Sequence, residues 1–461
     1  MNPKISWRSG LALSVLLVFV ALTACGYKTT TNYRAPTAVG LARYNANGTP
    51  DTTNLVGGTG LVTTDINTSQ DDVAFATVLQ PDGKIIAVGT SFTTPARIVV
   101  TRYNANGAPD LTFGTSGVTV TSLPSADASA FAATLDPDGK LLVAGRSCPL
   151  SGVPSFLLLR YNTAGALGTA GTLDTSFGTA GTGIVTTPIP SGSSTSANAV
   201  AVSGTNILLV GQTKIGGKLQ IVLAQYTSAG ALDTAGFGIP NGYVITPIGS
   251  LDAAAAALAV QPLGEIVVAG LAGNAFTNVW DVALLRYNTD GTLDLPFGGT
   301  GTGMAITDIG SSSNYANAVA LQADGKIVVA GNAFADPFGS GTSDIAVLRY
   351  NTDGSLDTTG FGIPNGYVTT NVGAFDNGFA VAVQPDNKIV VAGNADAGTG
   401  DRLALLRYTA NGSLDIDPTT GFGGGTGIVT RTASGPSTIA GAFGVVLQPQ
   451  PGGEIVVVGY D

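Results

Sequence analysis

One pattern of about 60 residues recurs seven times in this chain of 461 residues, and it limits the folds that the chain can adopt. Each copy has an alanine- and valine-rich run, a turn and a second apolar run, as in residues 318–331, Ala-Val-Ala-Leu-Gln-Ala-Asp-Gly-Lys-Ile-Val-Val-Ala-Gly. Each copy then continues with a segment of the type Leu-Arg-Tyr-Asn, a glycine-containing turn and Leu-Asp. The tyrosines that mark this segment are Tyr44, Tyr103, Tyr161, Tyr226, Tyr287, Tyr350 and Tyr408. Such a chain folds as a stack or a ring, because each unit mainly contacts its neighbours.

Each repeat predicts four short antiparallel strands. Runs such as Ile389–Ala392 are rich in β-branched residues and are bounded by turn residues, which favours strands over helices. Glycine is a poor helix former and accounts for 65 of the 461 residues. Dipeptides such as Asp82-Gly83 and Asn47-Gly48 supply the backbone freedom that tight hairpin turns need. We therefore expect a four-stranded meander in each repeat.

The two ends of the chain divide one repeat between them. After Tyr408 the sequence ends at Glu454–Asp461, where the next Leu-Arg-Tyr segment is due, and Val39–Asn45 supplies that segment. An open stack has no need of a split repeat, whereas a ring gains a noncovalent clasp that protects its edges. We predict an all-β fold, a seven-bladed β-propeller of four-stranded antiparallel blades whose last blade is closed by strands from both termini.

Small residues indicate which strand lies nearest the axis. A crowded centre favours small side chains, and the runs Ala253–Ala257 and Ala316–Ala320 provide them. With these runs innermost, the Val-Thr-Thr segments lie outermost and each terminus contributes two strands to the closure. A three-plus-one closure applies instead if Val-Thr-Thr is innermost.

The repeated phrases Leu-Gln-x-Asp-Gly-Lys-Ile-Val-Val-Ala-Gly, Leu-Arg-Tyr-Asn-x-Asp-Gly-Ser-Leu-Asp and Phe-Gly resemble the delta-sixty repeat family of bacterial exported proteins. The similarity covers residues 39–461 and extends more distantly to the NHL-type propeller repeat. This chain departs from the pattern at Gln225, which replaces the arginine, at Asn206, which replaces the Asp-Gly-Lys turn, and at Asn54-Leu55, which replaces Phe-Gly. The resemblance implies a propeller fold and no particular reaction.

The first residues predict export and a lipid anchor. Lys4 and Arg8 accompany a short apolar run, Leu11–Ala21, which is typical of a signal peptide. The next residues, Leu22-Thr23-Ala24-Cys25, resemble the lipobox of bacterial lipoproteins, in which the cysteine is acylated. We expect a signal peptide at 1–24, a lipid-anchored polar tether at 25–38 and the propeller at 39–461. The alternative is an ordinary signal peptide with a chance cysteine.

The resemblance to lipoproteins implies an extracytoplasmic protein of the bacterial cell envelope that is held to the membrane through lipid on Cys25. In a Gram-negative cell the protein would lie at the outer membrane, because Gly26 rather than aspartate follows the cysteine. With Cys25 acylated, Cys148 is left as a single thiol without an internal disulfide partner.

Charge and composition exclude several functions. A net charge of −10 argues against binding to nucleic acid. The chain has no histidine, which removes the commonest general base and the commonest metal ligand. We expect no cofactor, no metal, no enzymatic activity and a monomer.

Charged residues that recur in the repeats are interpreted as structural. An arginine before the marker tyrosine and an aspartate after the turn keep step with each other, as Arg349 and Asp357 do, which favours an ion pair that builds the scaffold. Segments such as Asn288–Asp294 resemble calcium loops, but the distal glutamate of an EF-hand does not follow.

Function is expected where the repeats differ. The connections between the second and third strands of each repeat vary, and together with the links into the first strands they gather aromatic and acidic residues on one face. The candidate binding residues are Phe92, Phe276, Trp280, Tyr315, Phe334, Phe338, Phe375, Asp281, Asp336, Asp344, Asp376 and Asp401. Such a mixture suits a protein or polysaccharide ligand. The alternatives are an enzyme that uses aspartates on an extracellular polymer, a purely structural envelope component, and rings that only pack under their own loops.

Overall fold

The computed structural model describes residues 37–165, 169–178, 180–274, 279–310, 312–335, 341–396, 401–431, 440–449 and 452–461. In this part of the chain the fold is all-β, with 28 strands and two short π-type turns, η1 (Gly238–Gly242) and η2 (Gly362–Gly366). The described residues contain no helix with the length and apolar character needed to cross a membrane.

The strands form antiparallel meanders in which chain order equals spatial order. The first two sheets are β3 (Asp72–Leu79), β4 (Ile85–Ser91), β5 (Arg97–Tyr103) and β6 (Val118–Thr121), then β7 (Ala126–Leu135), β8 (Leu141–Pro149), β9 (Ser155–Tyr161) and β10 (Ile184–Thr187). The next two are β11 (Ser196–Ser203), β12 (Asn206–Ile215), β13 (Lys218–Tyr226) and β14 (Tyr243–Thr246), then β15 (Ala253–Val260), β16 (Ile266–Asn274), β17 (Val279–Tyr287) and β18 (Met304–Thr307).

Two further meanders share one eight-stranded sheet. They are β19 (Asn314–Leu321), β20 (Ile327–Phe334), β21 (Ser343–Tyr350) and β22 (Tyr367–Thr370), and β23 (Phe375–Val383), β24 (Ile389–Asp396), β25 (Asp401–Tyr408) and β26 (Ile428–Arg431). A single parallel pair, Ser343 with Phe375, joins them. The predicted four-stranded antiparallel meander is therefore confirmed as the unit of the fold.

The last sheet contains both ends of the described chain. Its order is β2-β1-β28-β27, with β1 (Val39–Tyr44) and β2 (Leu61–Thr64) from one end and β27 (Gly441–Leu447) and β28 (Ile455–Tyr460) from the other. Strands β1 and β28 pair along their whole length, from Val39 opposite Tyr460 to Tyr44 opposite Ile455. This confirms that the termini share one sheet and that each contributes two strands.

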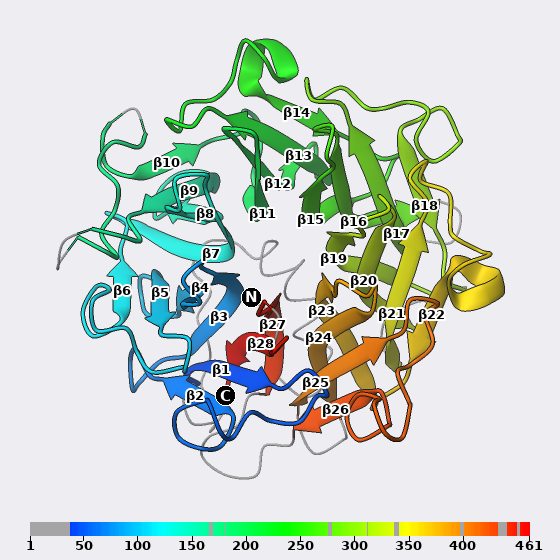
Figure 1. Cartoon of the computed structure of the whole chain (residues 1–461). Helices are drawn as coiled ribbons and strands as arrows, with labels where there is room; N and C mark the ends of the chain where they lie inside the picture. The colour runs from blue at the N-terminus through cyan, green and yellow to red at the C-terminus, as the bar shows by residue number, and fades with distance from the viewer. Residues whose placement is uncertain are drawn as a thin grey trace.

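The sheets are arranged around a common centre, as the blades of a propeller are (Figure 1). The first strand of each meander is innermost, and the short Val-Thr-Thr type strand lies at the periphery. Contacts between inner strands run in cyclic order through β3, β7, β11, β15, β19, β23 and β27, and β27 contacts β3. The prediction that the alanine-rich strands are innermost is confirmed.

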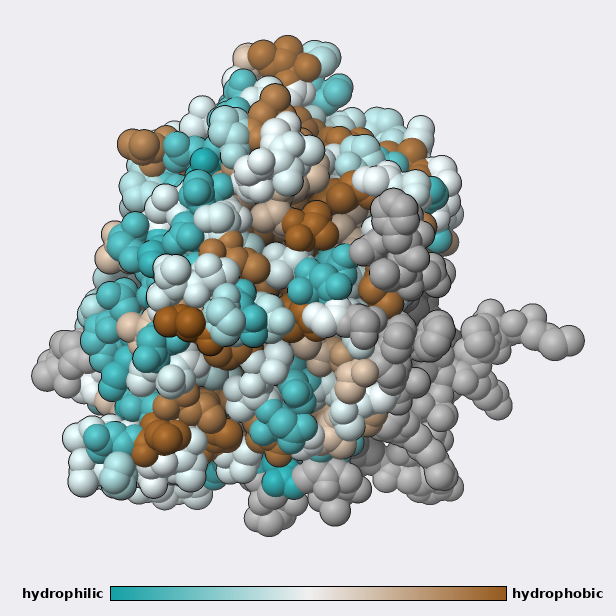
Figure 2. Space-filling model, turned by 90° about the vertical axis from the view of Figure 1, so that its right-hand side faces the viewer, coloured by the Kyte–Doolittle hydropathy of each residue, from teal (hydrophilic) through white to brown (hydrophobic). Residues whose placement is uncertain are grey.

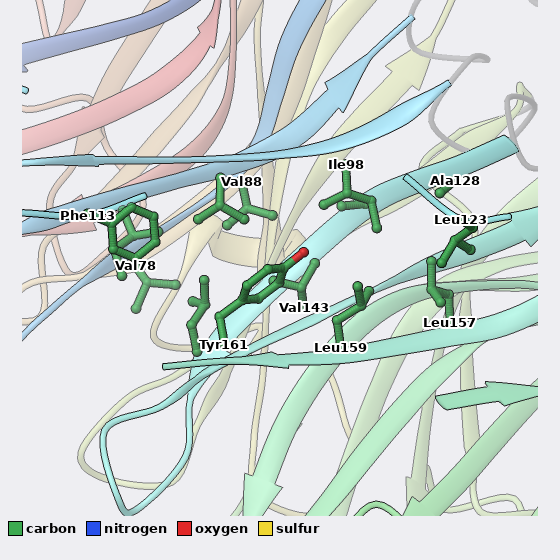
Figure 3. Packing of buried hydrophobic residues seen from close by; sticks show 14 of the residues in the cluster. Val78, Val88, Ile98, Phe113, Leu123, Ala128, Val143, Leu157, Leu159 and Tyr161 are labelled. Atoms are coloured by element: carbon green, nitrogen blue, oxygen red, sulfur yellow. The ribbon is translucent and has the colours of Figure 1, made fainter. Parts of the chain in front are cut away.

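Apolar side chains fill the space between neighbouring sheets. In Figure 3, Val88 and Ile98 of one sheet face Val143, Leu159 and Tyr161 of the next. The marker tyrosines are fully buried, and six of them make a hydroxyl hydrogen bond of 2.7–2.8 Å to a threonine in the outer strand of the preceding sheet. Burial of the ring with a satisfied hydroxyl is the favourable arrangement for tyrosine in a core.

The recurring arginine–aspartate pairs are structural, as predicted. Arg349 binds Asp357 at 2.8–2.9 Å, both side chains are nearly inaccessible, and the guanidinium lies 4.9 Å from the centre of the Phe361 ring. Arg349 Nη1 also donates to the backbone carbonyl of Ala410 in the next unit. The same donation from Arg407 to Ala46 crosses the closure. Each such arginine therefore joins its own turn to the neighbouring unit.

Candidate functional site

The register of the strands creates two different faces. The hairpins between the first and second strands and the links between the third and fourth strands lie on one side, which we call the turn face. The opposite side, the loop face, carries the connections between the second and third strands, such as 92–96, and the links into the inner strands, such as 122–125. This division follows because Ile85 pairs with both Leu79 and Tyr103, whereas Ser91 pairs with both Asp72 and Arg97.

On the turn face, aspartate and asparagine oxygens are used within their own turns. Asp290 Oδ1 accepts hydrogen bonds from the backbone N–H and the hydroxyl of Thr292 at 2.9 and 2.6 Å, which lowers the pKa of Asp290. Asp294 Oδ2 is bound by Arg286 at 2.6 Å. Among the residues that the structure describes, no three histidine, cysteine or acidic side chains form a group able to hold a metal ion. The calcium-like segment therefore functions as a turn.

The loop face carries the candidate binding residues, but not all of them can be placed. Phe276, Asp336 and Phe338 lie outside the described residues. Phe92, Trp280, Phe375, Asp344 and Asp401 are half-buried. The remaining four, Tyr315, Phe334, Asp281 and Asp376, are buried. The side chains that can offer contact area on this face are thus fewer than the sequence alone indicates.

A cluster of three rings connects two units of the loop face. Tyr315 of β19 and Phe334 of β20 pack edge to face with their centroids 5.5 Å apart, and Trp280 of β17 lies 6.2 Å from Tyr315. Burial raises the pKa of Tyr315 to about 12, so its hydroxyl stays neutral at physiological pH. Trp280 packs against the cluster that contains the buried rings of Tyr315 and Phe334. Trp280 is the ring of this cluster that is partly exposed to solvent.

Asp376 is the most perturbed carboxyl group of the loop face. Its side chain is inaccessible, and Oδ2 accepts the backbone N–H groups of Val372 and Gly373 at 2.5 and 2.9 Å. Oδ1 has no hydrogen-bond partner among the described residues. Burial, reinforced by the charges of Asp344 and Asp396, raises the pKa of Asp376 to about 6. Asp376 caps the link into β23 and is held away from solvent.

The other acidic candidates are also engaged with neighbouring groups. Asp344 Oδ1 accepts a hydrogen bond of 3.0 Å from Asn371, and Asp401 Oδ2 accepts one of 3.3 Å from the hydroxyl of Tyr460. The buried carboxylate of Asp281 contributes to the raised pKa of Asp308, for which burial is the larger cause. These carboxylates can receive hydrogen bonds from a ligand at the surface, where Asp344 and Asp401 are partly accessible.

The rim of the molecule does not present one broad apolar surface on the side seen in Figure 2, where hydrophobic residues alternate with hydrophilic ones. The large exposed apolar side chains are separate in the sequence and include Leu263 at 85%, Ile239 at 70% and Ile363 at 68% exposure. Scattered apolar residues of this kind are ordinary on a protein surface.

The expectation that Cys148 is an unpaired thiol is wrong in this structure. Cys148, in β8, is buried and disulfide-bonded. The sequence holds one other cysteine, Cys25, which lies outside the described residues. The earlier expectation followed from assigning the thiol of Cys25 to a lipid, and one sulfur atom cannot form both bonds.

Sequence reasoning missed the β-bulges of the inner strands. In each of these strands the pairing skips one residue, and the skipped residues line a central cavity: Phe75, Phe131, Asn198, Ala256, Asn317, Phe379 and Phe443. The available signal was that this position varies from aromatic to amide to alanine while the flanking residues recur.

The comparisons with known proteins agree with the repeat pattern. The family described as "Domain of unknown function (DUF5122) beta-propeller" matches residues 29–53, 80–113, 137–177, 261–297, 322–359 and 384–415. The matches skip the unit with Asn206 and Gln225, where the chain departs most from the pattern. No curated protein matches the chain.

Several solved structures are similar at low identity. A polysaccharide lyase of family PL25, an ulvan lyase bound to a sugar fragment, is 13% identical, with a TM-score of 0.43 and coverage of 81% of this chain and 86% of the lyase. Sqt1 of Chaetomium thermophilum, bound to the N-terminus of ribosomal protein L10, is 14% identical, with a TM-score of 0.41 and coverage of 84% and 94%. Drosophila Semaphorin 1b, extracellular domains 1–2, is 10% identical, with a TM-score of 0.41 and coverage of 92% and 88%. With scores this low, no binding property or activity passes from these proteins to this chain.

Proposed function

We propose that this chain is a cell-envelope lipoprotein whose closed, seven-bladed β-propeller binds a protein or a polysaccharide through its loop face, without catalysis. The observation that carries the proposal is the difference between the two faces. The turn face repeats similar turns whose polar groups form hydrogen bonds within the same turn, whereas the loop face carries a different connection in every unit. Loops on a rigid scaffold are the usual place for binding residues.

The seven-bladed ring is supported by the cyclic contacts of the inner strands and by the shared terminal sheet. A ring of this kind holds its loops in fixed relative positions, because each sheet packs against two neighbours. The loop face then offers an extended surface that carries a half-buried ring, Trp280, and the partly accessible carboxylates of Asp344 and Asp401. An aromatic ring with hydrogen-bond acceptors suits a sugar or a polar protein surface.

The proposal that the protein is not an enzyme rests on the chemistry of the loop face. Asp376, with its raised pKa, has a suitable proton affinity for a general acid, but its side chain is inaccessible and Oδ2 is committed to two backbone N–H groups. The accessible acids Asp344 and Asp401 bind neighbouring side chains of the protein.

A binding experiment with matched variants on the two faces tests the loop-face proposal. Trp280→Ala and Asp344→Asn alter the loop face, and Leu263→Ala alters an exposed apolar residue in a hairpin of the turn face. Purified variants, checked by thermal melting, are applied to a glycan array and are used for cross-linking in intact envelopes. We expect the loop-face variants to lose the bound glycan or the cross-linked partner, and Leu263→Ala to retain it. Equal retention by all three variants would contradict the proposal.

The anchor proposal has a chemical test of its own. Acylation of Cys25 and a disulfide between the two cysteines of the chain exclude each other, so the anchor proposal requires that Cys148 is a free thiol in the membrane-bound protein. Intact-mass analysis of the envelope-derived protein, with and without a thiol reagent, separates the two states. A lipid-anchored chain carries the acyl mass and one reactive thiol after denaturation, whereas a disulfide-bonded chain carries neither.

A further inference from the structure

At the centre of the ring lies a partly open cavity of about 150 Å³, which is lined by one residue from every inner strand. Each of these residues is the extra residue of a β-bulge. Bulges re-aim a side chain and recur near functional sites. Opposite each bulge, the second strand has a glycine, and a Cβ atom there would lie only 1.7–2.0 Å from an inner-strand carbonyl oxygen. The scaffold therefore fixes the bulge in every unit, while the residue that it carries differs from unit to unit.

One side of the cavity is aromatic. Phe379, Phe443, Phe75 and Phe131 come from β23, β27, β3 and β7, which are consecutive around the ring. Their ring centroids are 4.8, 5.3 and 5.8 Å apart in this order, and the planes are inclined to one another by 42–65°. Tilted rings of this kind offer edges and faces to another small aromatic ring, but they do not form the flat platform on which a sugar ring stacks.

The other side of the cavity is formed by Asn198, Ala256 and Asn317. Asn198 Nδ2 donates to the carbonyl of Ala255 at 2.8 Å, and Asn317 Nδ2 donates to the carbonyl of Gly378 at 3.0 Å. Both amides are thus oriented by the inner strand of the next unit. Asn198 Oδ1 accepts a hydrogen bond of 3.0 Å from the hydroxyl of Ser196, whereas Asn317 Oδ1 remains as a hydrogen-bond acceptor for a ligand.

The buried amide of Asn332, beside Asn317, has a hydrogen-bond donor near the cavity that is not satisfied by the described residues. Asn332 is inaccessible, and its Oδ1 accepts a hydrogen bond of 3.2 Å from Asn317 Nδ2. Its own Nδ2 has no hydrogen-bond partner among the described residues. A buried donor without a partner costs free energy, so a ligand or water that completes the amide network is favoured.

We propose that the axial cavity binds a small, neutral aromatic molecule with one ring and a hydroxyl group, of the phenol class. Its size matches a single ring, since an apolar cavity of about this volume holds benzene. Among the described residues, the lining of this cavity has no ionisable side chain, which disfavours a charged ligand. A monosaccharide would bury several hydroxyl groups against only two amides, and unpaired buried hydroxyls are costly. This site is separate from the loop-face contacts of the proposed function.

The chain itself suggests the variant that closes the cavity. Phenylalanine occupies the bulge position in four inner strands, so Ala256→Phe is compatible with the backbone and fills the space opposite the aromatic side. Asn317→Leu is a second variant of similar volume, which removes the acceptor and leaves most of the space. Leu263→Ala, in an exposed turn, is the matched control.

Isothermal titration with phenol, toluene and cyclohexanol, together with crystals soaked in phenol, tests the site. We expect phenol to bind the unaltered chain and Leu263→Ala equally, and to be lost from Ala256→Phe. Asn317→Leu should weaken phenol binding by about five- to tenfold, the value of one hydrogen bond, and leave toluene unchanged. Phenol that still binds Ala256→Phe, that fails to bind the unaltered chain at millimolar concentration, or that binds no better than cyclohexanol would overturn the proposal.

Discussion

At the scale of single residues, the contacts of three residues that depart from the repeat show which interaction the repeat normally makes at each position. Leu55 replaces the usual phenylalanine, is 3% exposed and fills the same space beneath a glycine turn, since a Cβ atom on Gly107 would lie 2.4 Å from its Cδ1. Gln225 replaces the arginine and still donates to Asp233 at 2.9 Å. Arg431 stands where other outer strands end in threonine, and it donates to the carbonyl of Thr59 across the closure at 3.1 Å. Leu55 and Arg431 preserve contacts between units and Gln225 preserves the contact with the aspartate of its own turn, which a sequence pattern alone cannot reveal.

The carboxyl group of Asp376 predicts a pH-dependent stability. Its pKa is about 6 in the folded chain and 3.8 ordinarily, so the folded state holds the proton more tightly than the unfolded state. Its contribution to the free energy of unfolding therefore falls as the pH rises from about 4 to about 6. In Asp376→Asn the amide oxygen can still accept from the backbone N–H groups. We expect this variant to be more stable than the unaltered chain by about 1–2 kcal/mol at pH 7.5, after allowance for solvent screening.

Urea unfolding at pH 4 and pH 7.5 measures this difference. The gain should be mostly lost at pH 4, where the carboxyl group of Asp376 is protonated in the folded state and about four-tenths protonated in the unfolded state. Asp324→Asn, in an exposed turn, is the control and should change little at either pH. A gain of equal size at both values of pH would show that the charge of Asp376 is not its cause.

At the scale of strands, regular features followed from the sequence and irregular ones did not. Alternation of β-branched runs with Asp-Gly and Asn-Gly turns predicted four strands per repeat, and small residues predicted the innermost one. The β-bulges were missed, because a bulge inserts one residue without changing the local composition. The sequence also predicted the binding residues of the loop face only in part, because residue type alone does not show which side chains are accessible. Tyr315 and Phe334 have the residue types of a binding surface, but their burial depends on how neighbouring sheets pack.

The glycine opposite each bulge is predicted to be indispensable. A Cβ atom on Gly331 would lie 1.8 Å from the carbonyl oxygen of Tyr315, which belongs to the backbone and cannot move aside without breaking the pairing of β19 with β20. Gly331→Ala should therefore lower the free energy of unfolding by about 3 kcal/mol. Gly299→Ala is the control, because it has open space around it and only a positive φ of 70°, with an expected cost of about 1 kcal/mol. Similar losses in the two variants, measured by urea unfolding, would rule out the steric explanation.

At the scale of the whole molecule, the sequence predicted that the two termini share one sheet, because this result follows from counting which parts of each repeat are present. The last copy lacks its second half and the first residues provide it, so no knowledge of side-chain packing was needed. The order of the strands also predicted which face carries the variable connections. The sequence did not predict the axial cavity, because the cavity arises only when residues about 60 positions apart in the sequence are brought together around one axis.

Removal of β28 should open the molecule. This strand lies between β27 and β1, and Ile455, Val456 and Val458 are completely buried. A chain that ends at Glu454 leaves both neighbours without a partner and exposes the cores on both sides of the sheet. With about 1.5–3 kcal/mol for each buried aliphatic side chain, the loss exceeds about 5 kcal/mol, which is comparable with the whole stability of a domain. We expect a larger radius of gyration by small-angle scattering and a broad unfolding transition.

Deletion of Asp461 alone, which loses a 2.7 Å hydrogen bond to the backbone N–H of Ala38, should leave the radius unchanged. Addition of a peptide of residues 455–461 to the shortened chain should restore the compact radius, since the closure is noncovalent. A shortened chain that is already compact, with the unfolding midpoint of the full chain, would mean that the clasp between the termini does not hold the ring together.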